Sequence, residues 1–276
     1  MTIDRYAVIG NPVAHSKSPI IHAAFAKATG QELSYERLLA PRDGFASTVE
    51  RFVAEGGKGL NVTIPFKLEA FALARKRSGR AESAGACNTL AWRGDHWYGD
   101  NTDGAGLLRD LTHNLGETIG GRNVLVFGAG GAVHGILQPL LAHGPKRIVL
   151  ANRTHVRAVE LAAHFAAAGP VVAIEPRSLA GERFDIVINA TSIGLDTPVP
   201  RDLWPDGLFA PGALAYDLVY ANQTTPFVRW AKEQGAARTA DGLGMLIEQA
   251  AESFLLWRGV RPDTACAFPL LRPQGS

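Results

Sequence analysis

The segment NVLVFGAGGA, residues 123–132, decides the fold of this chain. It places an apolar run, Val124 to Phe127, directly before closely spaced glycines and the start of a helix-forming stretch. Gly128 permits a tight turn. Gly130 lets the backbone approach an anion at the helix N-terminus, where free N–H groups and the helix dipole favour negative charge. The segment therefore predicts a strand, a glycine turn and a helix that bind the pyrophosphate of a dinucleotide.

This fingerprint is incomplete, because Val133 occupies the third glycine position and Gly131 is an additional glycine. A tight turn without any ligand is the plain alternative. The apolar strand before the glycines and the helix after them favour the dinucleotide site.

The end of the next predicted strand distinguishes between the two nicotinamide cofactors. NAD sites usually carry an acid there, which binds the ribose 2′-hydroxyl. Here Ala151 is followed by Asn152, Arg153 and Thr154, with no acid, and Arg157 lies one helical turn beyond Arg153. Two guanidinium groups at this spacing share one side of a helix and can clamp a 2′-phosphate. NADP is therefore the predicted cofactor, and a pair of ordinary surface arginines is the alternative.

Strand-like and helix-like segments alternate on both sides of this site, which predicts an α/β class with mostly parallel sheets. The predicted strands are 6–9, 33–39, 59–62, 90–92, 97–98, 124–127, 147–151, 171–174, 185–189 and 213–217. The predicted helices are 19–29, 44–54, 104–115, 132–143, 155–168, 226–234 and 243–257. The residues Arg93-Gly94-Asp95 predict a hairpin turn.

Two domains are expected from a length of 276 residues. We expect an N-terminal α/β substrate domain, residues 1–103 with 243–276, and a Rossmann-type dinucleotide-binding domain, residues 104–242, with a cleft between them. The last helix is expected to cross back onto the first domain.

The composition limits the classes of partner. A net charge of +2 is too small to indicate nucleic-acid or membrane binding. The dense basic run Arg75-Lys76-Arg77 with Arg80 is interpreted as a solvated helix face. Cys87 and Cys266 lie far apart in no metal-like spacing, so we expect no metal and reduced thiols, and no apolar window is long enough for a membrane span. A cytoplasmic protein is expected.

Polar residues recur in the first domain where predicted strands give way to loops. Ser18 and Pro19 begin a predicted helix, with Ser18 as a natural N-cap, so hydroxyls and a helix dipole face a potential carboxylate. The segments NVTIPFK at 61–67, CNT at 87–89 and GDNTDG at 99–104 follow in order.

Together these segments resemble the shikimate dehydrogenase family. The motifs GNPVAHSKSP, NVTIPFK, AGACNTL, GDNTDG, VFGAGGA, ANRT, NATSIGL, YDLVY, TPF and DGLGMLIEQAA occur in the family's order from Gly10 to Ala251. The resemblance implies the reversible NADP-dependent reduction of 3-dehydroshikimate to shikimate, and a place in aromatic amino acid and chorismate biosynthesis. Two departures are mild, Cys87 before Asn-Thr and Ala221-Asn222 after the tyrosine.

Carried over by motif, the resemblance assigns roles to individual residues. The substrate carboxylate would be held by Ser16, Ser18 and Tyr220. The ring hydroxyls would be held by Asn61, Thr63, Asn88, Asp103 and Gln249, and the catalytic pair would be Lys67 and Asp103. The cofactor would be bound by Gly128, Ala129, Gly130, Gly131, Ala132, Asn152, Arg153, Thr154 and Arg157, and its nicotinamide side would be lined by Thr191, Leu218 and Gly242.

Oxidation of a secondary alcohol releases a proton from oxygen as a hydride leaves carbon, so one group must lie within hydrogen-bond reach of that hydroxyl. Burial lowers the pKa of a lysine, whereas a neighbouring carboxylate keeps it charged. We therefore predict a coupled pair, with Lys67 as proton carrier and Asp103 as its orienter and a substrate ligand. An exposed Lys67 at a helix start is the alternative.

Two other functions stay open at this point. A quinate/shikimate dehydrogenase shares the fold but often accepts NAD through an acid after the second strand, which Asn152-Arg153-Thr154 lacks. A non-catalytic NADP-sensing module needs the glycine fingerprint but not the Lys67–Asp103 pair. The sequence leaves open whether the protein is a monomer or a homodimer.

Overall fold

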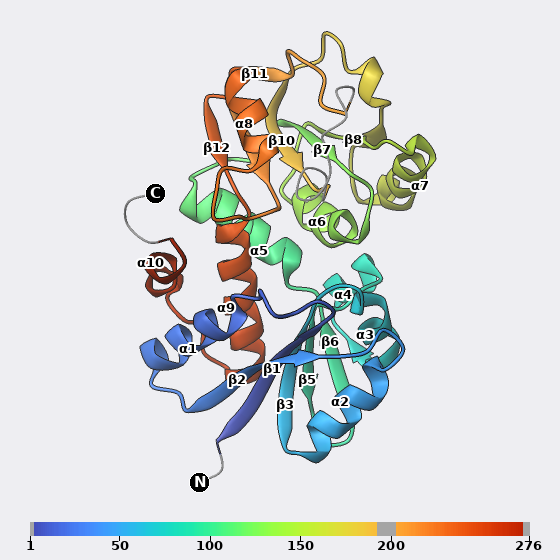
Figure 1. Ribbon diagram of the computed structural model, residues 1–276. Helices are drawn as coiled ribbons and strands as arrows, with labels where there is room; N and C mark the ends of the chain where they lie inside the picture. The colour runs from blue at the N-terminus through green and yellow to red at the C-terminus, as the bar shows by residue number, and fades with distance from the viewer. Residues whose placement is uncertain (1–2, 192–202, 273–276) are drawn as a thin grey trace. The chain divides into compact units, whose positions relative to one another are not determined.

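The structure is a computed structural model that describes residues 3–191 and 203–272. The chain divides into two compact units, residues 1–107 with 246–276, and residues 108–245. Each unit contains one six-stranded sheet with helices packed against it (Figure 1). The α/β class predicted from the alternating segments is confirmed. Among the described residues, no helix is both long enough and apolar enough to cross a membrane.

The sheet of the first unit has the strand order β2-β1-β3-β5-β6-β4. Its strands are β1 (Asp4–Gly10), β2 (Leu33–Leu39), β3 (Gly57–Val62), β4 (Lys76–Arg77), β5 (Thr89–Trp92) and β6 (Trp97–Asp100). Strand β1 pairs in parallel with β2 and β3, whereas β5 pairs antiparallel with β3 and β6. The predicted hairpin, with its turn at residues 93–95, is therefore present as β5 and β6.

Helices cover both faces of this sheet. The helices of this part of the chain are α1 (Ser18–Thr29), α2 (Phe45–Ala54), α3 (Lys67–Leu73), α4 (Gly79–Ala84), α5 (Asp103–Arg109), α9 (Leu243–Arg258) and α10 (Phe268–Leu271), with a 3₁₀ turn η4 (Thr264–Cys266). Alternate β1 residues face opposite sides. Ala7 and Ile9 belong to the core under α2, α3 and α4, whereas Tyr6 stacks on Trp257 of α9. Figure 1 shows α1 and α9 on one side of the sheet and α2 on the other.

One edge of this sheet collects the polar motifs. The carboxyl ends of β1 and β3 lie at the same edge because the two strands are parallel. The antiparallel β5 begins at that edge, where Thr89 pairs with Asn61, and β6 ends there at Asp100. The loops that leave these strands therefore bring together residues from four separate parts of the sequence.

The second unit contains the glycine segment. Its strands are β7 (Asn123–Phe127), β8 (Arg147–Ala151), β9 (Val171–Ala173), β10 (Phe184–Asn189), β11 (Phe209–Asp217) and β12 (Arg238–Ala240). Its helices are α6 (Gly131–Ala142), α7 (His155–Phe165) and α8 (Pro226–Glu233), with a π-helical turn η1 (Asp110–Asn114) and 3₁₀ turns η2 (Ala166–Ala168) and η3 (Pro176–Ser178).

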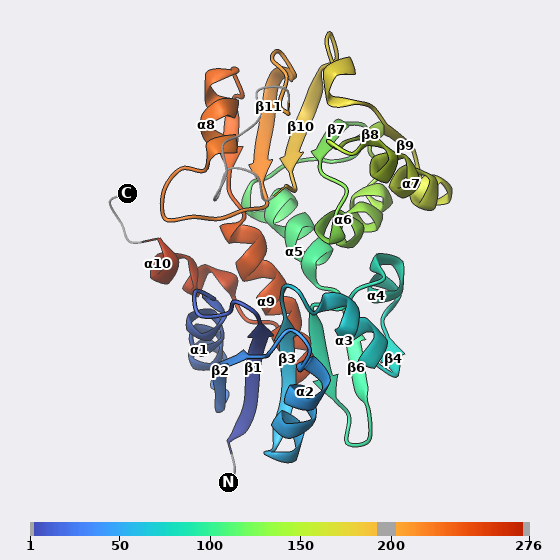
Figure 2. The same cartoon turned by 45° about the vertical axis from the view of Figure 1, so that its right-hand side comes forward.

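All strand pairs of this second sheet are parallel, in the order β12-β11-β10-β7-β8-β9. Figure 2 shows β11 and β10 side by side with their arrows pointing the same way. After β7 the chain moves outward through β8 to β9, and it then returns to β10 on the other side of β7. This reversal is a topological switch point, and ligands of such sheets bind outside the carboxyl ends of the strands beside it.

The helix predicted over 104–115 is present, as an α-helix to Arg109 that continues as the π-helical turn η1 to Asn114. Two local predictions are wrong. Ser18 is not the N-cap of α1, because the helix already begins at Ser18 and Lys17 occupies the cap position without a side-chain hydrogen bond. The basic run is not a solvated helix face. Lys76 and Arg77 form β4, and the guanidinium of Arg80 is engaged by carboxylates.

Candidate functional site

The centre of the polar edge of the first unit is an ion pair between Lys67 and Asp103. Lys67 is the first residue of α3, and Asp103 is the first residue of α5. The two groups lie 2.5 Å apart, from Nζ of Lys67 to Oδ2 of Asp103. The lysine side chain is 28% exposed and the aspartate side chain 11% exposed, so the pair is open to a ligand on the lysine side. Lys67 is therefore not the isolated exposed lysine of the alternative interpretation.

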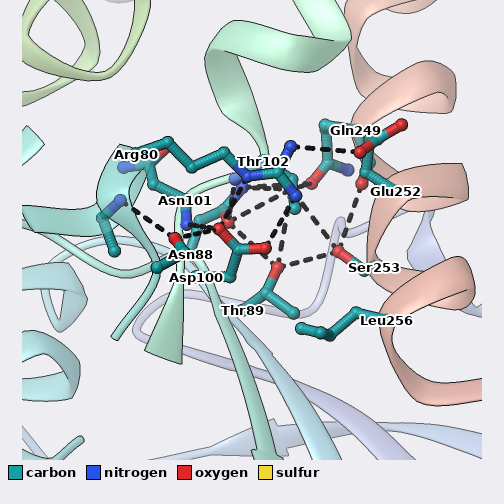
Figure 3. Close-up of polar contacts among 12 residues, drawn as sticks. Arg80, Asn88, Thr89, Asp100, Asn101, Thr102, Gln249, Glu252, Ser253 and Leu256 are labelled. Atoms are coloured by element: carbon teal, nitrogen blue, oxygen red, sulfur yellow. Dashed lines mark hydrogen bonds and ion pairs between the residues drawn. The ribbon is translucent and has the colours of Figure 1, made fainter. Parts of the chain in front are cut away.

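Asn88 supports the second oxygen of this aspartate. Its Nδ2 donates to Oδ1 of Asp103 at 2.8 Å, and its Oδ1 accepts the backbone N–H of Thr102 at 2.8 Å. The same amide nitrogen lies 3.3 Å from Oε1 of Gln249, which comes from α9. Figure 3 shows Asn88, Thr102 and Gln249 converging in this network. Asn88, Asp103 and Gln249, predicted from three separate motifs, are therefore brought together.

Asn61 is also buried at this edge of the sheet. Its Oδ1 accepts from the hydroxyl of Tyr35 at 2.7 Å and contacts Nε2 of His22 at 3.1 Å. Its Nδ2 donates to the hydroxyl of Ser253 at 2.8 Å and to that of Thr89 at 3.3 Å. These contacts fix the orientation of the Asn61 amide in the floor of the site.

His22 and Tyr35 form an aromatic layer behind Asn61. Their rings stack with centroids 4.2 Å apart and an angle of 8° between planes. His22 is 1% exposed, and burial lowers its pKa to about 3 even though the contact with Asn61 raises it. The imidazole is therefore neutral at neutral pH, and it adds a rigid, uncharged support to the site.

The two predicted carboxylate-binding serines lie in the loop between β1 and α1. The hydroxyl of Ser16 donates to that of Ser18 at 3.2 Å, and the carbonyl of Ser16 accepts from the guanidinium of Arg37. Thr63, which is half-buried, follows β3 and donates its backbone N–H to the carbonyl of Ile9 at 3.0 Å. These hydroxyls thus come from loops at the same edge of the sheet as Asn61.

In the second unit, the glycine segment has the geometry that an anion site needs. Gly128 has φ of +119°, a conformation that favours glycine, and a Cβ there would lie 3.1 Å from the carbonyl oxygen of Ala190. At Gly130 and Gly131 a Cβ would meet nothing within 4 Å, so the backbone beside Ala129 and Ala132 is open at the start of α6. The residues present therefore fit a dinucleotide pyrophosphate.

The arginines predicted to select NADP lie on the surface next to this turn. Arg153 follows β8, and Arg157 lies in the first turn of α7; both are exposed. Neither makes a salt bridge with any residue in 3–191 or 203–272. Asn152 donates to the backbone carbonyl of Thr154, which shapes the turn between the strand and the helix. Two uncompensated cations thus lie where a 2′-phosphate is expected.

The segments predicted to border the nicotinamide follow β10 and β11. The N–H and hydroxyl of Thr191 both donate to Oδ1 of Asn189, and Nδ2 of Asn189 donates to Asp217 at 2.9 Å. A Cβ on Gly242 would lie 2.1 Å from the carbonyl oxygen of Leu218, so only glycine fits this close approach. Thr191, Leu218 and Gly242 are therefore held by the ends of neighbouring parallel strands. The rest of the NATSIGL turn, from Ser192 on, lies outside the described residues.

Tyr220 is half-buried in the second unit after β11, and burial raises its pKa. It belongs to a different unit from Ser16 and Ser18, so its predicted contact with the substrate carboxylate stays a prediction. His22, Tyr35 and Ser253, which surround Asn61, lie outside the predicted site motifs. The apolar spacing around His22 was the only local signal of its burial, and none pointed to its partner Asn61.

Matches to known families cover both units. Residues 8–90 match the shikimate dehydrogenase substrate binding domain, residues 110–202 match shikimate / quinate 5-dehydrogenase, and residues 242–267 match the shikimate 5′-dehydrogenase C-terminal domain. A curated shikimate dehydrogenase (NADP(+)) from Aromatoleum aromaticum is 58% identical over 99% of both chains. The chain belongs to the shikimate dehydrogenase family.

Solved structures agree with this membership. The Ael1 enzyme from Pseudomonas putida is 48% identical and superposes with a TM-score of 0.91, covering 98% of both chains. A shikimate 5-dehydrogenase from Thermus thermophilus, determined in complex with NADP(H) and shikimate, is 33% identical with a TM-score of 0.83, covering 96% of this chain and 97% of that one. The predicted family, with its two α/β domains, is confirmed.

Proposed function

We propose that this chain catalyses the reversible reduction of 3-dehydroshikimate to shikimate with NADPH, and that Lys67 and Asp103 form its catalytic pair. The observation that carries the assignment is the 2.5 Å contact between Nζ of Lys67 and Oδ2 of Asp103, at a sheet edge where Asn88 and Gln249 also converge. A lysine and a carboxylate in hydrogen-bond contact can bind a hydroxyl and move its proton.

Each group of the first unit has a role in this proposal. Lys67 donates a proton to the carbonyl oxygen during reduction and accepts it from the hydroxyl during oxidation. Asp103 orients the ammonium group and binds a neighbouring ring hydroxyl, and polar side chains fix the remaining oxygens. The ring hydroxyls are assigned to Asn61, Thr63, Asn88 and Gln249, and the substrate carboxylate to Ser16, Ser18 and Tyr220.

The second unit holds the cofactor in this proposal, and NADPH supplies the hydride when it is bound. The open turn at Gly128–Ala132 accommodates the pyrophosphate, and the unpaired cations of Arg153 and Arg157, with Asn152 and Thr154, hold the 2′-phosphate. Thr191, Leu218 and Gly242 border the nicotinamide. Residues 1–103 with 243–276 then form the substrate domain, and residues 104–242 form the NADP domain.

We also propose that the enzyme acts in the cytoplasm, within the pathway to chorismate and the aromatic amino acids. The free thiols of Cys87 and Cys266 are in keeping with a reducing compartment. It is proposed to be a monomer or a homodimer, which light scattering on the purified protein distinguishes.

The test of the catalytic assignment is replacement of Lys67 by Ala. Turnover with shikimate and NADP⁺ should fall by roughly 10²–10⁴ because the proton carrier is lost, while the KM for shikimate changes little. Lys58→Ala is the matched control, because Lys58 is an exposed lysine toward the other end of β3 and should leave both constants unchanged. A Lys67→Ala enzyme with near-normal turnover would falsify the assignment.

A further inference from the structure

Arg80, in the first turn of α4, makes a two-pronged ion pair with Asp100 at the end of β6. Its Nε and Nη2 donate to the two carboxylate oxygens at 2.7 and 2.6 Å. Asp100 is 3% exposed, so its charge depends on protein partners rather than on water. Burial acts to lower the pKa of Arg80, but the carboxylates of Asp100 and Glu252 together raise it above its ordinary value.

The Arg80–Asp100 pair fixes the loop that carries Asp103. Oδ1 of Asp100 also accepts the backbone N–H of Asn101 at 2.7 Å. The side chain of Asn101 then binds on both sides: its Oδ1 accepts the N–H of Asp103 at 3.2 Å, and its Nδ2 donates to the carbonyl of Ala86 at 3.1 Å. The start of α5, and with it the Asp103 carboxylate, is thus set by the residues that Arg80 anchors.

The third nitrogen of the same guanidinium reaches helix α9. Nη1 of Arg80 donates to Oε2 of Glu252 at 3.1 Å, as Figure 3 shows. Glu252 lies one helical turn beyond Gln249, and its other oxygen pairs with Arg261. Arg261 in turn binds Glu248 at 2.7 Å. These contacts fix the rotation of α9 about its axis and therefore the direction in which Gln249 points.

We propose that Arg80 is a positioning residue that fixes the side chains of Asp103 and Gln249 relative to each other. The inference rests on the proposed role of these two residues as substrate ligands. Only a planar guanidinium presents three donors in the directions of Asp100 and Glu252, so a lysine at this position cannot replace it. A buried ion pair adds little to the stability of a protein compared with well-packed apolar side chains. The main contribution of the Arg80 ion pairs is therefore to orient the residues that they join.

The experiment is the Arg80→Lys variant, which keeps the charge but loses the fork of donors. The KM for shikimate should rise about tenfold, the effect of one misplaced hydrogen-bonding ligand. The KM for NADP⁺ should stay unchanged because the proposed cofactor residues lie in the other unit. Arg77→Lys is the matched control: the Arg77 side chain binds Glu82 and the carbonyls of Phe71 and Ala74, and within the described residues this side chain donates no hydrogen bond to β6 or α9.

Gln249→Ala separates this inference from the proposed function. If Gln249→Ala leaves the KM for shikimate unchanged, the substrate assignment itself is wrong. If Gln249→Ala raises that KM, Arg80→Lys should raise it less in the Gln249→Ala background than in the parent, because part of its effect passes through Gln249. The positioning role is overturned if Arg80→Lys raises the KM for shikimate and the KM for NADP⁺ equally. It is also overturned if the effects of Arg80→Lys and Gln249→Ala on the KM for shikimate are fully additive. Should Arg80→Lys not fold, Glu252→Gln is judged by the same criteria.

Discussion

Lowering the pH from about pH 7 to about pH 5 should destabilise the first unit through His22. Burial lowers the pKa of this histidine from 6.5 to about 3 in the folded protein, and unfolding returns it to water. Between these two values the unfolded chain binds a proton that the folded chain does not. The free energy of unfolding therefore decreases as the pH falls below 6.5, and this loss is complete below about pH 3.

The magnitude follows from the two pKa values. Between the folded and the unfolded pKa of His22, each pH unit lowers the free energy of unfolding by about 1.4 kcal/mol. A pH of about 5 lies about 1.5 units below the pKa of the unfolded chain, so His22 should lower the free energy of unfolding by about 2 kcal/mol. The protein has other titratable groups, so the contribution of His22 is measured as the difference between the parent and a His22→Gln variant. His22→Gln keeps a donor for Oδ1 of Asn61 but cannot become charged.

The assay is urea denaturation of both proteins at the two pH values. Amide exchange of β1, an inner strand of the first sheet, distinguishes unfolding of the first unit from that of the second. Between about pH 7 and about pH 5, the free energy of unfolding of the parent should fall by about 2 kcal/mol more than that of His22→Gln. Equal losses refute the reasoning. If the variant does not fold, the ring resonances of His22 in the parent decide, because a titration midpoint near 6.5 contradicts the burial argument in the same way.

Two further predictions concern the second unit. Arg153→Ala should raise the KM for NADP⁺ far more than that for NAD⁺, because only NADP carries the 2′-phosphate; steady-state kinetics with both cofactors and shikimate measures this, and equal effects would remove the assignment. Gly128→Ala should lower the free energy of unfolding by about 1–3 kcal/mol, because alanine is strained at positive φ and its Cβ would crowd the carbonyl oxygen of Ala190. Denaturation measures the second effect, and an unchanged midpoint would show that the turn relaxes without strain.

The sequence predicted most of the regular structure because the long elements carry local signals. Strand β7 and helix α6 follow from an apolar run and closely spaced glycines, and β2 and β8 were placed at the residues where they occur. Short elements such as β4, with two residues, have too few positions to show a period. Strand β4 is defined by its hydrogen bonds to β6, and the local sequence does not indicate which distant strand a segment will pair with.

The same distinction separates the predicted site residues from those that were missed. Lys67, Asn88 and Asp103 stand in motifs that can be read one at a time. Arg80 was interpreted as solvated because its own surroundings in sequence are basic, while its partner Glu252 is far away in the chain. His22 reads as part of an apolar helix face, and only the fold places Asn61 against it.

The geometry around Asp103 bears on which group moves the proton. Oδ1 of Asn88 accepts the backbone N–H of Thr102, so the Asn88 amide must turn its Nδ2 toward Oδ1 of Asp103. The other oxygen, Oδ2, faces the ammonium group of Lys67. Each carboxylate oxygen thus has a donor directed at it, and a proton on Asp103 would require one of these donors to turn away. In the proposed reaction, the ammonium group of Lys67 would therefore give its proton to the carbonyl oxygen during reduction, and the neutral amine that is left would take the proton back during oxidation, while Asp103 would bind a neighbouring ring hydroxyl.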